Sequence, residues 1–138
     1  MVAAFLTLFL MACAPAIYPA TTWDFIQQHR SQDGLSRFEW DDSLLPVLNQ
    51  RAQHLAENLE LNHDGLKDAY NASPAYDRDI CEIGGKQPLD ALPDSVGFGI
   101  VESPPHHACL DDPKYTRGAI AAYVGADGWV YEVMWLTD

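Results

Sequence analysis

The chain has 138 residues, with 20 acidic against 8 basic side chains and a formal net charge of −12. This length fits one domain with a single hydrophobic core. So acidic a surface repels nucleic acid and anionic lipid headgroups, and we therefore expect no nucleic-acid partner. It favours a cationic partner or a bound cation, although a well-solvated acidic surface is the simpler interpretation.

The N-terminal segment predicts export. Its first twelve residues carry no charge and are mostly apolar. They are too few for a permanent membrane span and are typical of a secretory signal. Leu10 to Cys13 resembles a bacterial lipobox, in which the leader is cut before an acylated cysteine. We predict a signal peptide over residues 1–12, a lipidated linker over 13–21 and one domain over 22–138, anchored to a bacterial membrane through Cys13. A plain signal peptide cut nearby is the alternative.

Two helices are predicted next. The first covers Thr22 to Arg30, is capped by Thr21 or Thr22, and ends in a left-handed turn at Gly34.

The second helix is the clearest element of the chain. Apolar side chains recur at helical spacing from Leu44 to Leu59, which predicts one buried stripe. Asp41 or Asp42 can cap this helix, and its end is expected around residues 62–65.

The middle of the chain is irregular. Residues 64–80 are polar and are predicted to form a loop, and residues 80–85 a short strand or turn. Residues 89–102 can hold a helix, but Pro93, Gly97 and Gly99 weaken that prediction.

The C-terminal part predicts a short helix and a hairpin. The helix starts at Ser103-Pro104-Pro105 and stops before Pro113. Strands over 117–124 and 129–136 are joined by a turn at 125–128. This order of elements favours an α+β fold with helices packed on an antiparallel sheet.

Four stretches, in order along the chain, form a pattern. They are FIQQHRSQDGLSRFEWDDSLLPVLNQRAQHLAENLELNH, CEIGG, SPPHHACLDDPKYTRGAI and DGWVYEVMWL. Together they resemble the CAP superfamily of cysteine-rich secretory, antigen 5 and pathogenesis-related proteins. The resemblance runs from about Trp23 to Leu136 and is closest to the compact bacterial type. It implies a CAP-like α-β-α sandwich with a central antiparallel sheet.

The resemblance also implies a cleft with two histidines and two glutamates. His63 and His106 match the histidines and Glu82 matches the first glutamate, while Glu102 is the candidate for the second. Two imidazoles and a carboxylate can hold Zn²⁺ with an open position for water, so His63 and His106 are the expected metal ligands. His107 is about 100° further round the same helix and is expected to be exposed.

His29 and His54 lie on the two predicted N-terminal helices. Solvated or core-edge positions are expected for both, rather than ligation.

The three cysteines suggest one pair. If Cys13 is acylated, Cys81 and Cys109 remain, and in an exported protein a disulfide is the default. Two buried thiols that never meet are the alternative. The resemblance brings Glu82 and His106 to one cleft, and so implies that the neighbouring cysteines are close enough to bond.

Three functions are consistent with these features. The first is a lipid-anchored cell-envelope protein that binds a small ligand, a glycan or another envelope protein in the His/Glu cleft, with or without zinc. The second is a metal-dependent hydrolase acting on peptide or cell-wall substrates. The third is a surface lipoprotein of a phage or mobile element that blocks a receptor. No nucleophile is evident in the sequence, which favours binding and leaves catalysis as an open alternative.

Overall fold

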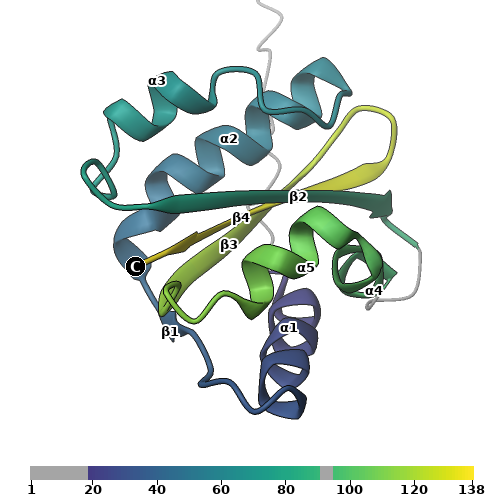
Figure 1. Cartoon of the computed structure of the whole chain (residues 1–138). Coiled ribbons are helices and arrows are strands. Elements are labelled where there is room, and N and C mark those ends of the chain that lie inside the picture. The colour runs from purple at the N-terminus through teal and green to yellow at the C-terminus, as the bar shows by residue number, and fades with distance from the viewer. Residues whose placement is uncertain (1–18, 91–94) are drawn as a thin grey trace, which may run out of the picture.

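The computed structural model describes residues 19–90 and 95–138, and these form a three-layer α-β-α sandwich (Figure 1). The predicted signal peptide and the predicted acylation of Cys13 lie outside the described residues. The predicted α+β sandwich is confirmed. None of the described helices is both long and apolar enough to span a membrane.

The central sheet has the strand order β1-β3-β4-β2. Its strands are β1 Glu39–Trp40, β2 Ile80–Pro88, β3 Arg117–Val124 and β4 Trp129–Thr137. β4 pairs antiparallel with both β2 and β3, as the predicted hairpin requires. The short β1 pairs parallel with β3, so the sheet is mixed, with the predicted antiparallel pairing over its three long strands.

One face of the sheet is covered by α2 Leu45–Asn58, which follows the 3₁₀ turn η1 Asp42–Leu44. The buried stripe of α2 packs on side chains of β3 and β4, as its helical spacing predicts. Asp41 accepts a hydrogen bond from the backbone N–H of Ser43 and so caps the 3₁₀ turn. The helix ends earlier than expected, because Leu59 adopts a left-handed backbone with φ 56°.

The opposite face is covered by α1 Ala20–Gln32, α4 Ser95–Glu102 and α5 Pro104–Asp111 (Figure 1). Side chains of all three helices form a second core with the sheet. α1 begins two residues before the predicted Thr22, after Pro19 and without a side-chain cap. The turn at Gly34 is left-handed, as predicted, with φ 74°.

In the middle of the chain the prediction of a loop over residues 64–80 is wrong, and two open alternatives are decided. α3 Leu66–Asn71 is a helix inside the expected loop, where several of its side chains pack against the core beneath α2. Of the predicted strand or turn at residues 80–85, the strand is present, and β2 is longer than expected at nine residues. α4 is a helix despite its glycines, and it packs so close to β2 that a Cβ on Gly85 would lie 2.4 Å from a methyl carbon of Val96.

The expected disulfide joins Cys81 on β2 to Cys109 on α5, with their Cα atoms 6.3 Å apart. It therefore fixes α5 to the edge of the sheet. The prediction of a Cys81–Cys109 bond is confirmed.

Candidate functional site

Glu82 lies on β2 and is the centre of a buried polar network. Its side chain is only 2% exposed. Oε1 accepts hydrogen bonds from Arg51 Nη2 (2.6 Å) and His63 Nδ1 (3.0 Å). Oε2 accepts from Arg51 Nε (3.0 Å) and Trp135 Nε1 (2.7 Å). Each oxygen of the Glu82 carboxylate therefore accepts two hydrogen bonds.

These donors decide the charge of Glu82. Burial by itself raises the pKa of a carboxyl group, but hydrogen bonds from Arg51, Trp135 and His63 outweigh it, and the pKa of Glu82 lies below its usual value. The side chain is thus an anion at neutral pH. An anion needs every nearby group to donate, so Nδ1 of His63 carries a proton and Nε2 is the nitrogen left for a ligand.

Arg51 comes from α2 and was not foreseen. Besides Glu82, its guanidinium donates to the carbonyl oxygens of Asn62 and Asp64. It thereby holds both sides of the loop that carries His63. A signal was present in the sequence: an arginine between Leu48 and Leu55 on the buried stripe of a helix needs a buried acidic partner.

His106 lies on α5 and faces the same site. Among the described residues no group hydrogen-bonds its buried Nδ1. Burial, and then the charge of His63, lower the pKa of His106 below its usual value. His106 is therefore expected to be a neutral imidazole at pH 7, and its Nδ1 can bind an incoming group.

His63, Glu82 and His106 line one pocket, which the structure shows as an open cavity of about 170 Å³. The other lining residues are Leu55, Leu61, Asn62 and Gly84. The structure thus brings together the three residues that the resemblance suggested. Glu102 is exposed at the end of α4 and does not line this pocket.

The donor set allows only a limited zinc site here. Four hydrogen bonds occupy both oxygens of Glu82, so Glu82 orients His63 as a carboxylate partner instead of binding an ion itself. Zn²⁺ would be held by His63 and His106, and would supply Lewis acidity toward a bound ligand.

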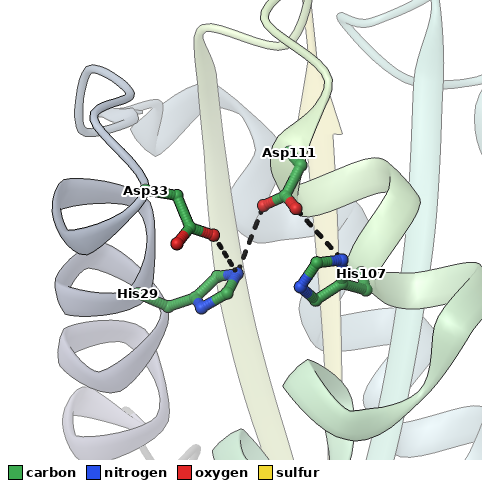
Figure 2. Close-up of side chains that lie close together, drawn as sticks. All are labelled: His29, Asp33, His107 and Asp111. Carbon is green, nitrogen blue, oxygen red and sulfur yellow. Dashed lines mark hydrogen bonds and ion pairs between the residues drawn. The ribbon is translucent and has the colours of Figure 1, made fainter.

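A second group with metal-binding chemistry lies elsewhere, and sequence reasoning missed it. His29, Asp33, His107 and Asp111 could hold a metal ion: one ligand atom from each lies within 4.8 Å of every other (Figure 2). His29 does lie at the edge of the core and His107 is partly exposed, but both contribute to this group. The signal was the spacing His-x-x-x-Asp, which occurs at the end of α1 and on α5. His54 is exposed.

Solved structures of bacterial proteins share this fold. An outer surface protein from Borrelia burgdorferi superposes with a TM-score of 0.72 at 17% identity, covering 90% of this chain and 97% of that one. A cysteine-rich secretory protein from Staphylococcus aureus gives 0.65 at 13% identity, over 86% of this chain and 38% of the other. An extracellular protein with a SCP domain from Bacillus anthracis gives 0.61 at 18% identity, over 83% and 39%.

No curated protein matches the sequence significantly. The family model of the cysteine-rich secretory protein family, CAP, matches residues 23–137. This range contains every described strand and all but the first residues of α1. The chain therefore belongs to the CAP family of cysteine-rich secretory proteins.

Proposed function

We propose that this chain is an exported, lipid-anchored protein of the bacterial cell envelope that binds a small uncharged ligand in the pocket of His63 and His106. The observation that carries the binding role is the pair of imidazoles beside an open cavity, with one of them oriented by a buried carboxylate.

Export is supported by two independent features. Similar structures are described as an outer surface protein, a secretory protein and an extracellular protein. The disulfide between Cys81 and Cys109 fits an oxidising compartment, because cytosolic thiols are kept reduced.

Anchoring depends on Cys13 in the lipobox-like sequence. We expect the full chain, expressed in a bacterial host, to incorporate labelled palmitate and to partition into the detergent phase of Triton X-114. Cys13→Ser should abolish both properties, since no acyl acceptor then remains at the cleavage site. A native chain that stays in the aqueous phase, or a Cys13→Ser chain that still takes up label, contradicts the anchor.

The pocket favours a small neutral group. Its volume of about 170 Å³ is close to that of an engineered cavity of about 150 Å³ that binds benzene, which indicates a group of about six heavy atoms. Leu55 and Leu61 provide apolar contacts, and the imidazoles provide hydrogen bonds. The net charge of −12 and the anionic Glu82 disfavour an anion. An acetamido group of an envelope glycan fits within this volume and offers a methyl group, a carbonyl and an N–H.

Binding is better supported than covalent catalysis. Among the residues that the structure describes, those that line the pocket include no serine, threonine, cysteine or lysine. The cysteine nearest in sequence to Glu82, Cys81, is held in the disulfide and has no free thiol.

Titration of the ¹⁵N-labelled chain with chitotriose, an uncharged N-acetylglucosamine trimer, tests the pocket. We expect the ring signals of His63 and His106 to shift and those of the exposed His54 to stay unchanged. His106→Ala should weaken binding at least tenfold, because a pocket hydrogen bond and its packing are both lost. Decanoate, which is apolar but anionic, should bind more weakly. Unchanged ring signals at millimolar chitotriose contradict this choice of ligand class.

A further inference from the structure

Two helices present matching histidine–aspartate pairs to one another. His29 and Asp33 are one turn apart on and just after α1, and His107 and Asp111 are one turn apart on α5. Residues four apart lie on the same face of a helix. Figure 2 shows all four side chains pointing into the space between the two helices.

The distances place these groups around a common point. His29 Nε2 lies 3.3 Å from Asp33 Oδ2 and 3.2 Å from Asp111 Oδ1. His107 Nδ1 lies 3.0 Å from Asp111 Oδ2, and the centroids of the two imidazole rings are 5.1 Å apart. Neighbouring ligands of a tetrahedral ion with bonds of about 2.0–2.1 Å lie roughly 3.3 Å apart. The three contacts are close to that spacing, and one ligand atom from each of the four residues lies within 4.8 Å of every other.

From this geometry we propose that His29, Asp33, His107 and Asp111 bind one divalent transition-metal ion, of which Zn²⁺ is the expected occupant. Two imidazoles and two carboxylates suit zinc and its neighbours, whereas magnesium and calcium prefer oxygen ligands alone. The ion would also neutralise two carboxylates on a strongly acidic chain.

The site has an anchored side and an open side. The His29 side chain is 12% exposed, whereas those of Asp33 and His107 are 43% and 44% exposed. A metal ion can therefore enter from solvent, while His29 keeps its place at the edge of the core. One mostly buried ligand and three more exposed ligands, with Asp111 31% exposed, allow small movements to complete the coordination.

The two helices are already tied together beside the site. Arg30 Nη1 donates to the carbonyl oxygen of Leu110 at 2.7 Å, which links α1 to the end of α5. The disulfide of Cys109 fixes α5 to β2 between the two ligands that α5 supplies. The charge of Arg30 also interacts with Asp111 and weakens its attraction for a cation. The hydrogen bond and the disulfide hold α1 and α5 in place before the metal binds. They therefore reduce the ordering cost of binding and offset part of the repulsion between Arg30 and the metal ion.

The site is independent of the proposed pocket function, although both use α5. His106 lines the pocket, and its neighbour His107 is turned by about 100° around the helix axis toward α1. A metal ion between α1 and α5 would join the two helices and stabilise the folded chain, by an amount that rises with the logarithm of the free metal concentration once that exceeds the dissociation constant.

Equilibrium dialysis of the full chain against 10 µM free Zn²⁺, followed by metal analysis, tests the site. We expect about one zinc per chain, and a higher Tm with zinc than with chelator. His107→Ala and Asp33→Asn should each weaken zinc binding at least tenfold, because each removes one of four ligands. Both residues are partly exposed, so circular dichroism of the metal-free variants should match the parent. Co²⁺ bound in place of zinc should give the visible absorption of a tetrahedral site, and His107→Ala should abolish it.

Three matched variants locate the metal. His54→Ala removes an exposed histidine on α2, while His63→Ala and His106→Ala remove the pocket imidazoles. All three should retain zinc. Absence of zinc from the parent chain overturns the proposal. So does zinc that persists unchanged in His107→Ala, or zinc that disappears only when a pocket histidine is removed.

Discussion

Replacing Arg51 by methionine is expected to lower the free energy of unfolding by about 3–5 kcal/mol at pH 7. The side chains of Arg51 and Glu82 are only 4% and 2% exposed, so the change leaves a carboxylate buried without its main counter-charge. Trp135 and His63 still donate to Glu82, but neither replaces the paired hydrogen bonds of the guanidinium. The loop that carries His63 also loses its contacts with Arg51.

Urea unfolding at pH 7 and pH 4 measures this effect. Removal of Arg51 leaves burial to raise the pKa of Glu82, so the variant should recover part of the deficit at pH 4, where Glu82 can become neutral. The matched control is Arg78→Met, which breaks an ion pair with Asp41 in which Arg78 is 33% exposed, and it should cost about 1 kcal/mol or less.

The double variant Arg51→Met/Glu82→Leu separates the lost pair from lost packing. It should be more stable than Arg51→Met alone, because no uncompensated charge is then buried. Equal losses in Arg51→Met and Arg78→Met contradict the central role of the Arg51–Glu82 pair.

The elements that could be predicted are those with local signals. The stripe of α2 and the β3–β4 hairpin have clear periodicity, and both are present. β2 and α4 contain glycines, which weaken both the strand pattern and the helix pattern of the sequence. Tertiary contacts therefore determine which structure each segment adopts. All nine residues of β2 pair with β4, and Gly85 is needed because Val96 of α4 packs against it.

The functional residues also differ in whether the sequence gives a signal for them. His63, Glu82 and His106 were found through family resemblance, because nothing in their spacing brings them together. Arg51 and the proposed metal-binding group depend on partners far away in the sequence. His29 and Asp111, for example, are 82 residues apart. Each half of that group has an i,i+4 signal, but only the packing of α1 beside α5 joins the halves.

Glu132 on β4 contrasts with Glu82. Its side chain points to the face that carries Met134 and Leu136, and it is buried at 4% exposure. Among the described residues no group hydrogen-bonds its Oε2. Burial raises the pKa of Glu132 from 4.5 to about 7, and only a weak interaction with the Thr22 side chain opposes the shift.

This shift makes the folded chain less stable as pH rises. Between pH 4.5 and about pH 7 the folded state holds a proton on Glu132 that the unfolded state has released. Stability from this group is therefore fully present below pH 4.5 and declines up to about pH 7, by about 3 kcal/mol in total.

Glu132→Gln should abolish this pH dependence, because an amide resembles the protonated acid and cannot ionise. At pH 8 the variant should be more stable than the parent by about 3 kcal/mol, and at pH 4.5 the two should be nearly equal. Urea unfolding at the two pH values measures the difference. The control is Glu39→Gln, whose side chain is 79% exposed and should give parallel curves. If Glu132→Gln also runs parallel to the parent, Glu132 is already ionised in the folded chain, which contradicts a buried neutral carboxyl group at this position.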